Sequence, residues 1–416
     1  MRIALSSPVR EGTFLVGCAT SLLFAWALCF QAVAEHWLQN LATRERLARA
    51  ARLQPLNAEI PEKLGIVEMS ASTADFAGAV LHLQRAVALN PHSSRAWLNL
   101  ADAYAVIDDG FRREDAVRHA LAAEPKDTQV QWEAANLFIT TDLDRSLQLL
   151  RGVVENDPQY APAAMQVAYA ASNNNIEKAM LAVPLAATSR LHLMRWLLER
   201  NEFNAADRVW PTVIASPGNV SARETFFYFD SLIARHQVDR AAAAWSEVVH
   251  KDAALRERLQ RDNLLHNGDF EGDLLNGGFG WRYIPTSGVA ATLDTSTFHG
   301  GTRSLALQID GENLQDLGVR ELVKVEPGAQ YRLSGWLHAE ELEAAHGIRI
   351  GVNDAYTHSQ LWMTDDVLGS FPWRQLDGTF TVPQETTLVE ISLMRSPASG
   401  HIRGRLWVDD LRLENR

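Results

Sequence analysis

Cysteine is nearly absent from this sequence. The chain of 416 residues contains two cysteines, Cys18 and Cys29, and both lie in one apolar segment near the N-terminus. With no cysteine after residue 29, no disulfide can cross-link the rest of the chain, and no thiol chemistry is available there.

Basic charge is also scarce. Lys and Arg number 39 against 51 Asp and Glu, so the formal net charge is −12 with histidine neutral. No run rich in Lys or Arg offers a site for a polyanion. The balance therefore argues against nucleic acid as a partner and against a polybasic membrane-surface patch.

Catalytic motifs are missing as well. The sequence has no glycine-rich phosphate loop, no Gly-x-Ser-x-Gly, no His-Glu-x-x-His and no close pair of cysteines. The adjacent carboxylates Asp365 and Asp366 would face opposite ways on a strand, which is poor geometry for shared acid–base work. We therefore expect a protein that is not an enzyme, and a polysaccharide-active lyase or glycosidase is the alternative.

The overall amino-acid composition indicates a multidomain globular chain. With 47% hydrophobic and 22% charged residues over 416 positions, the chain suits two or three domains. The expected fold class is multidomain α + β: an N-terminal transmembrane helix, an α-solenoid and a C-terminal β-sandwich of the jelly-roll type. The predicted boundaries are 1–36 for an anchor or signal peptide, 37–55 for a linker helix, 56–260 for the solenoid and 263–416 for the sandwich.

One long apolar segment, Phe14–Ala34, precedes the body. As a helix it would be roughly 30 Å long, enough to cross the hydrocarbon core of a bilayer. Small residues at 32–34 also fit a signal-peptide cleavage site, so removal of the segment is the alternative. Arginines at 44, 46, 49 and 52 weaken the positive-inside argument for an N-in orientation. We expect a single-pass anchor in a bacterial inner membrane, with the body in the periplasm or outside the cell.

The middle of the chain is a helical repeat. Pro91, Pro125 and Pro158 end similar phrases at spacings of 34 and 33 residues. Because proline cannot continue a helix, each marks the turn between two helices. The period is that of tetratricopeptide repeats, which this segment resembles. That resemblance implies a solenoid whose concave face binds a protein partner.

From residue 263 the sequence changes to short alternating runs separated by Gly and Pro turns, typical of a β-sandwich. We expect strands at 302–309, 319–325, 331–338, 348–352, 375–382, 388–394 and 405–413. The segment opens with Asn267-Gly268-Asp269-Phe270-Glu271 and closes with Val408-Asp409-Asp410-Leu411-Arg412-Leu413. In these motifs it resembles carbohydrate-binding modules of the family 4/9/22 type, and the resemblance implies a jelly roll that binds a glycan on a concave sheet.

Carboxylates at the two ends of this segment form the candidate metal site. Modules of the resembled type hold a structural calcium near their chain ends, and carboxylate oxygens suit that ion. The resemblance assigns Glu271 and Asp409 first and Asp269 after them. The alternative is a solvated acidic edge.

Strand parity selects the candidate glycan-binding residues, because successive side chains on a strand point to opposite faces. Trp336 lies opposite the apolar Leu333 and Leu337. Arg349 and Glu390 lie opposite apolar neighbours in the same way, and Trp362 falls in an expected loop. By contrast, three further tryptophans, Trp281, Trp373 and Trp407, lie among core residues and are interpreted as packing.

Together these features predict an exported, membrane-anchored, non-catalytic scaffold. Its sandwich would bind a polysaccharide or cell-wall glycan and its solenoid a protein, a combination resembling accessory proteins of bacterial exopolysaccharide or cell-envelope assembly. The alternative is a pure protein-interaction scaffold whose sandwich binds no sugar. Whether Trp336, Arg349 and Trp362 converge on one open surface distinguishes the two.

Overall fold

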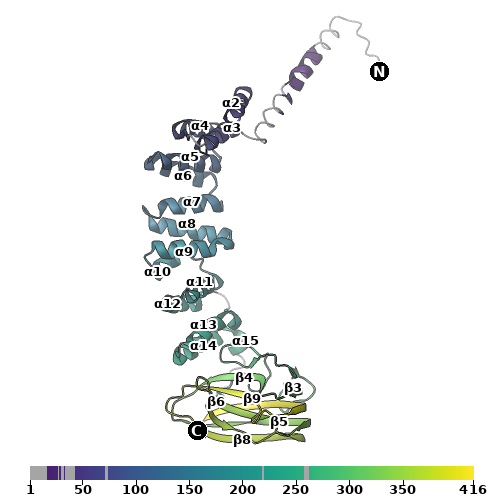
Figure 1. Ribbon diagram of the computed structural model, residues 1–416. Helices are drawn as coiled ribbons and strands as arrows, with labels where there is room; N and C mark the ends of the chain where they lie inside the picture. Colours follow the sequence, from purple (N-terminus) through teal and green to yellow (C-terminus); the bar gives the residue numbers. More distant parts are fainter. Residues whose placement is uncertain are drawn as a thin grey trace, which may run out of the picture. The chain divides into compact units, whose positions relative to one another are not determined.

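A computed structural model describes residues 16–26, 28–29, 32, 43–70, 74–217, 220–256 and 262–416 (Figure 1). The chain divides into two compact units, Met1–Pro184 and Leu185–Arg416. Unit 1 is helical, and unit 2 combines helices with a two-sheet β-sandwich.

Unit 1 is built from consecutive helices that pack as antiparallel neighbours. They are α2 (Arg44–Leu53), α3 (Glu59–Ser70), α4 (Phe76–Leu89), α5 (Ser94–Val106), α6 (Gly110–Ala123), α7 (Thr128–Phe138), α8 (Leu143–Asn156), η1 (Pro158–Tyr160), α9 (Ala161–Ala171), α10 (Ile176–Ala179) and η2 (Met180–Ala182).

The repeat phrases produce the helix boundaries. Helices α4 and α6 end directly before Asn90-Pro91 and Glu124-Pro125. The next helices then start with side-chain caps, in which Ser93 accepts a hydrogen bond from the N–H of Ala96 and Asp127 from that of Val130. Such caps satisfy amide groups that have no partner inside the helix. The predicted pairing of helices at the tetratricopeptide period is confirmed.

The N-terminal prediction is corrected. Among the residues that the structure describes, no helix is long and apolar enough to cross a membrane. The predicted single-pass anchoring, and the placement built on it, are therefore wrong. Residues 14–15, 27, 30–31 and 33–34 of the predicted segment lie outside the described residues.

Unit 2 begins with helices α11 (Ala187–Glu199), α12 (Phe203–Ala215), α13 (Ala222–Ala234), α14 (Val238–Lys251) and α15 (Ala253–Arg256). The sandwich follows. Its strands are β1 (Arg282–Tyr283), β2 (Val289–Asp294), β3 (Ser304–Glu312), β4 (Asp316–Lys324), β5 (Gln330–Ala344), β6 (Arg349–Asp354), β7 (Gln360–Met363), β8 (Gly369–Thr381), β9 (Leu388–Met394) and β10 (His401–Asn415).

The strands form two antiparallel sheets of five. The β4 sheet has the order β1-β4-β9-β6-β7, and the β5 sheet has the order β2-β3-β10-β5-β8. Alternate residues of each strand point between the sheets into one core, which includes Leu307, Leu333, Ile391 and Leu406. The predicted sandwich is confirmed, and the sequence reading missed β1, β2 and β7.

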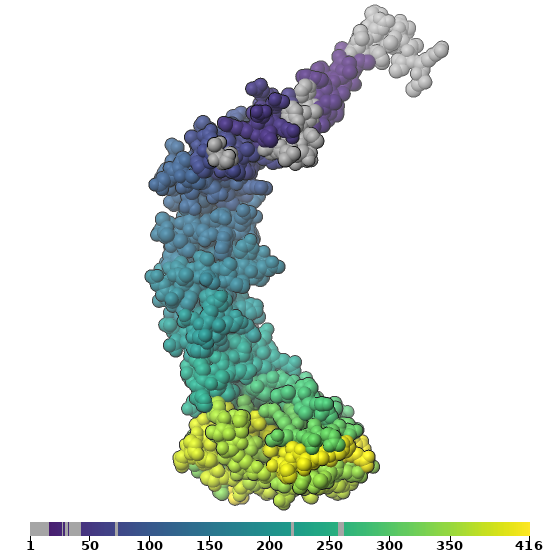
Figure 2. Space-filling model, in the orientation of Figure 1, coloured from purple at the N-terminus to yellow at the C-terminus, as the bar shows by residue number. Residues whose placement is uncertain are grey.

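The two ends of the sandwich, which carry the opening and the closing motif, lie side by side. The N–H of Leu264 donates to the carbonyl of Leu413, and the N–H of Leu411 donates to that of Gly268. Figure 2 shows the green start and the yellow end of the sandwich adjoining on its surface. Apart from one bridge between His266 and Gly280, the opening segment 263–272 is irregular rather than a strand.

The β4 sheet contacts the last long helices of unit 2. Lys324 of β4 forms an ion pair of 2.8 Å with Asp239 of α14. Arg282 of β1 reaches Asp230 of α13 at 3.0 Å. The Tyr356 hydroxyl, which follows β6, donates to the carbonyl of Ile233. These contacts involve the β4 sheet, so the outward side of the β5 sheet is the face to search for a ligand.

Candidate functional site

Aromatic rings gather on the outward side of the β5 sheet. We call this set the aromatic face, and it consists of Trp336, Trp373, Trp407, His299 and His338. His338 contacts Trp407 at a ring-centroid distance of 4.9 Å and Trp373 at 5.6 Å. His299 lies 3.9 Å from Trp336 and 5.7 Å from Trp373. The five rings therefore form one continuous cluster.

Alternation along β5 and β10 places these rings outside the core. Leu333, Leu337 and Leu406 point into the sandwich core, whereas Trp336 and Trp407 do not belong to it. Trp407 is paired with His338 across the two strands, so their side chains lie on the same side of the sheet. The outward position predicted for Trp336 is confirmed.

Polar groups surround the aromatic face. The Trp407 indole donates to Asp294 at 2.8 Å, and hydrogen bonds from Ser296 and from Trp407 lower the pKa of the Asp294 carboxyl against the opposing effect of burial. The Arg405 guanidinium lies over Trp407 and pairs with Glu340. Flat rings with a charged rim are what carbohydrate recognition uses, because sugars present apolar C–H faces and hydroxyl edges.

Two indoles of the aromatic face have unused donors. Within the described chain, no hydrogen bond of the Trp336 or Trp373 indole N–H is present, although Trp407 uses its own. Both side chains are partly exposed. Each therefore has an indole N–H that can donate to a sugar hydroxyl.

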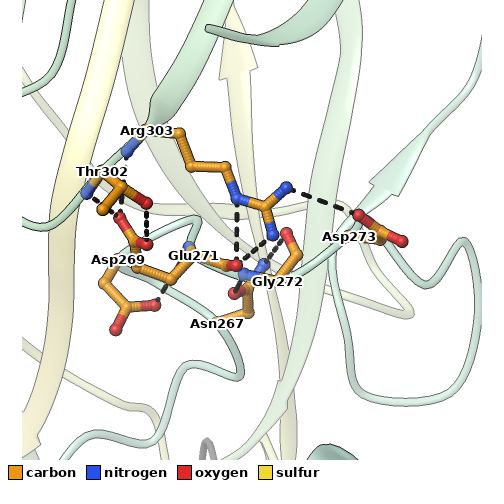
Figure 3. Close-up of polar contacts among 7 residues, drawn as sticks. All are labelled: Asn267, Asp269, Glu271, Gly272, Asp273, Thr302 and Arg303. Atoms are coloured by element: carbon orange, nitrogen blue, oxygen red, sulfur yellow. Dashed lines mark hydrogen bonds and ion pairs between the residues drawn. The ribbon is translucent and has the colours of Figure 1, made fainter. Parts of the chain in front are cut away.

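Glu271 holds the loop between β2 and β3 (Figure 3). Its Oε1 accepts from the N–H of Thr302 (2.6 Å) and of Arg303 (3.0 Å), and its Oε2 accepts from the Thr302 hydroxyl (2.6 Å). The Arg303 Nε–H donates to the Glu271 carbonyl at 2.9 Å. Burial disfavours the charged carboxylate, but these hydrogen bonds outweigh burial and lower the pKa of Glu271.

Asp409 holds the same loop from the other side. Its Oδ2 accepts from the N–H of His299 (2.8 Å) and of Gly300 (3.1 Å). Here burial is the larger effect and raises the pKa of the Asp409 carboxyl despite three backbone hydrogen bonds. The register of β10 shifts after Asp409, a bulge at which Asp410 has a positive φ of 49°. Asp410 consequently also reaches His299, at 2.7 Å.

The predicted calcium ligands do not fit a cation cage in this arrangement. Glu271 and Asp409 accept hydrogen bonds from N–H groups at both ends of one loop, and the Arg303 guanidinium occupies the Glu271 carbonyl. Asp269 lies beside Glu271, whose N–H it accepts at 3.5 Å. Across the described residues, no group of three His, Cys, Asp or Glu side chains is arranged to hold a metal. Calcium binding stays a prediction.

The other predicted glycan ligands lie on the β4 sheet. Arg349 of β6 pairs with Asp366 at 2.6 Å, and Glu390 of β9 pairs with Arg320 at 3.2 Å. Outward faces of the two sheets of a sandwich point in opposite directions. Arg349 and Glu390 therefore do not converge with Trp336. By the criterion of convergence, a glycan site made of the predicted residues is not favoured, and this outcome counts toward the pure protein-interaction scaffold.

Trp362 also differs from its predicted setting. It belongs to strand β7 rather than a loop, and its ring packs against the core, 6.4 Å from the ring of Phe380. A side chain at Gly378 of β8 would clash with the Trp362 ring. This indole thus fills the edge between the two sheets. Binding roles for Arg349, Trp362 and Glu390 stay predictions.

Sequence reasoning missed Trp373 and His299, whereas Trp407, which was interpreted as packing, is indeed buried although it lies on the outward side of β10. Trp373 was interpreted as packing because apolar residues flank it, but its side chain is partly exposed. Strict parity along 405–413 would have assigned Trp407 to the outward face. No sequence signal marks His299, because its position follows from the loop and the β10 bulge.

Unit 1 contains a separate concave site between α5 and α7, a cavity of about 500 Å³. Its lining includes Arg95, Asn99, Asp102 and Glu133. Burial raises the pKa of the Asp102 carboxyl, and burial together with the nearby charge of Asp102 raises that of Glu133. A cavity along the first helices of successive repeats is where such solenoids accept a partner segment.

The comparisons with known proteins agree with the two-part organisation. Residues 262–400 match the family of carbohydrate binding domains, which confirms the predicted resemblance for the sandwich. That match spans about a third of the chain. The chain has no match among curated protein sequences.

Solved structures with some likeness include a carbohydrate-binding module of family 4, at 15% identity over 36% of this chain and 99% of that one, with a TM-score of 0.29. The xylan-binding domain CBM22-1 from Paenibacillus barcinonensis Xyn10C has 15% identity over 33% and 85%, with a TM-score of 0.25. YrrB, a tetratricopeptide protein with a peptide-binding site, has 14% identity over 42% and 93%, with a TM-score of 0.28. Likeness of this size carries no argument about function.

Proposed function

We propose that the chain is a non-catalytic scaffold whose sandwich binds a β-linked glycan through the aromatic face and whose solenoid binds a protein segment. The observation that supports the glycan-binding half is the cluster of rings on the outward side of the β5 sheet, where Trp336 and Trp373 keep free indole donors. The family match of residues 262–400 supports the same function.

Binding by stacking explains the construction of the face. A pyranose places its C–H groups on an indole and directs its hydroxyls to the rim, where Asp294, Glu340 and Arg405 offer acceptors and donors. No covalent step is required. Because the rings come from three paired strands and one loop held by carboxylates, the surface is preorganised, which limits the entropy lost on binding.

Affinity electrophoresis of the full-length protein tests this function with three soluble polysaccharides, a β-1,4-xylan, a β-1,4-glucan and a β-1,3-glucan. We expect retardation by at least one of them. The double variant Trp336→Ala/Trp373→Ala should lose it, because truncation of a central aromatic anchor costs about 2 kcal/mol or more.

Arg349→Ala and Glu390→Ala provide matched controls on the opposite sheet. Both should keep the wild-type retardation if the aromatic face is the binding surface. Loss of binding in either variant, with the tryptophan variant unaffected, would instead support the ligands predicted on the β4 sheet. Absence of retardation by all three polysaccharides would favour the pure protein-interaction scaffold.

The protein-binding half is supported by the cavity between α5 and α7. Solenoids of stacked helix pairs present their first helices along a concave surface that accepts extended segments. Pull-down with the full-length protein tests this half when Asn99→Arg, which places a bulky charge in the cavity, is compared with the wild type. A partner that both proteins retain equally would contradict binding at this cavity.

A further inference from the structure

One face of Trp336 is already covered. The imidazole of His299 stacks on the indole with ring centroids 3.9 Å apart and an interplanar angle of 13°. A pyranose stacking on that face would need the same space, since stacked rings lie at about this separation. The Trp336 platform and the imidazole are therefore mutually exclusive on that face.

The contacts around His299 fix this position. An imidazole N–H at Nδ1 donates to Asp410 Oδ2 at 2.7 Å, and Asp409 accepts the backbone N–H of His299 at 2.8 Å. Gly300 allows the close approach, because a Cβ there would come within 2.6 Å of Asp410 Oδ2. At the other end of the loop, Glu271 accepts the N–H groups of Thr302 and Arg303.

Trp373 is not covered in this way. His299 meets it at 67° and His338 at 41°, with centroids 5.7 and 5.6 Å away. Neither ring lies parallel over the Trp373 indole. The face thus contains one capped and one uncapped stacking position.

We propose that His299 is a specificity-determining residue of the glycan site, a cap that closes one face of Trp336 to stacking and leaves Trp373 as the uncapped stacking position. This inference rests on the proposed glycan-binding function. Removal of the imidazole opens Trp336 as a second stacking position, so a longer stretch of the polysaccharide can be held. The carboxylates of Asp409, Asp410 and Glu271 act as positioning groups for the cap.

The first experiment needs no glycan. Full-length protein is treated with the indole reagent 2-hydroxy-5-nitrobenzyl bromide, and the modification of each tryptophan is followed by peptide mass spectrometry. His299→Ala should accelerate modification of Trp336 at least threefold, and Asp410→Asn, which retains the side-chain shape, should accelerate it less. Trp407, which is 4% exposed, serves as the internal control for folding. An unchanged rate at Trp336 with Trp407 protected overturns the inference.

The second experiment is a double-mutant cycle in the affinity electrophoresis described above, with the same three polysaccharides. Trp336→Ala should change wild-type affinity less than twofold, whereas His299→Ala should raise affinity three- to tenfold. In the His299→Ala background, Trp336→Ala should remove that gain. Weaker binding by His299→Ala overturns the inference, because the imidazole would then be a sugar contact. If Trp336 opens to the reagent but no variant binds any polysaccharide, the proposed function fails, and the specificity role fails with it.

Discussion

Glu321 is a carboxyl group in the core of the sandwich. The side chain is fully buried, and its Oε1 accepts the N–H of His266 at 2.6 Å. Its Oε2 has no hydrogen-bond partner within the described structure. Burial raises the pKa of Glu321 well above 4.5, although the hydrogen bond from His266 opposes the shift.

We predict that Glu321→Gln increases the free energy of unfolding at pH 7. The raised pKa means that the protonated carboxyl contributes stability that is complete below pH 4.5 and is lost as pH rises through the folded pKa. Glutamine cannot ionise and keeps an acceptor for His266, so we expect a gain of about 1–3 kcal/mol at pH 7. Chemical denaturation at several pH values measures it.

The exposed Glu312 on β3 provides the control for this substitution. Glu312→Gln should change the free energy of unfolding by less than about 0.5 kcal/mol, as is usual for surface positions. At pH 4 the advantage of Glu321→Gln should shrink. A constant difference between Glu321→Gln and the wild type from pH 4 to pH 8 would show that ionisation of Glu321 is not its cause.

Glu271 provides a second prediction, in which the stability of the fold depends on pH in the opposite direction from the dependence predicted for Glu321. Its pKa is lowered, so its hydrogen bonds to Thr302 and Arg303 stabilise the fold above pH 4.5 and are lost as pH falls through the folded pKa. Glu271→Ala should therefore lower Tm strongly at pH 7, and the difference from the wild type should become smaller as pH falls through the folded pKa. Each hydrogen bond to a charged group contributes about 1.5–3 kcal/mol.

Measurement of Tm also tests whether the sandwich binds calcium. If the carboxylates only hold the loop, EDTA leaves the Tm of the wild type unchanged and Glu271→Ala lowers it equally with and without chelator. If a calcium ion binds, chelation removes about 2.7 kcal/mol at a hundredfold excess over Kd, and Asp409→Ala abolishes the difference. The second outcome would establish the sequence-based prediction.

At the scale of helices and strands, the sequence predicted which helices and strands form better than it predicted where each one lies in the fold. Proline spacing predicts the helix pairs because each of Pro91, Pro125 and Pro158 stops one helix. Parity predicted the outward position of Trp336 but not that Arg349 belongs to the other sheet, since alternation says nothing about which sheet a strand joins. The alternation of side chains along a strand also could not predict the β10 bulge at Asp410. One extra residue in the strand changes the side to which the Asp410 side chain points.

Helices α5 and α7 carry a prediction of their own. Burial disfavours the charges of Asp102 and Glu133 and raises the pKa of each carboxyl, and the charge of Asp102 adds to the shift of Glu133. Asp102→Asn/Glu133→Gln should slow amide exchange of α5 and α7 at pH 7, by a stabilisation of up to about 1 kcal/mol because both groups are partly exposed. Raised pKa values require the effect to vanish below pH 3.8.

The control for this prediction is Glu114 on α6, which forms an i,i+4 ion pair with Arg118 on the surface. Glu114→Gln should leave exchange in α5 and α7 nearly unchanged, since such pairs contribute about 0.3–0.5 kcal/mol. Faster exchange in the double variant at pH 7 would mean that the two carboxylates make stabilising contacts as ions.

At the scale of the whole molecule, the sandwich of unit 2 is not isolated from the helices that precede it. Trp245 of α14 lies 5.5 Å from the His266 ring and 6.3 Å from Phe279. Gly278, with a positive φ of 59°, lets the chain pass under the Trp245 indole, since a Cβ at Gly278 would come within 2.6 Å of that ring. Phe226 of α13 packs on Gly277 in the same way. Unit 2 therefore extends across the domain boundary predicted at residues 260–263.

The final prediction is that Trp245→Ala weakens both sides of this contact. Trp245 is 9% exposed, and truncation of a buried tryptophan to alanine costs about 3–5 kcal/mol. Part of that loss belongs to the sandwich, because the segment 262–281 loses its cover. Amide exchange of peptides from 262–281 and from α14 in the full-length protein should both accelerate. Trp196 of α11 is a matched control, being also 9% exposed in the same unit but packed among helices. Trp196→Ala should accelerate exchange in α11 and leave 262–281 protected. If Trp245→Ala also leaves 262–281 protected, the sandwich holds that segment unaided and is stable by itself, as the sequence-based boundary implied.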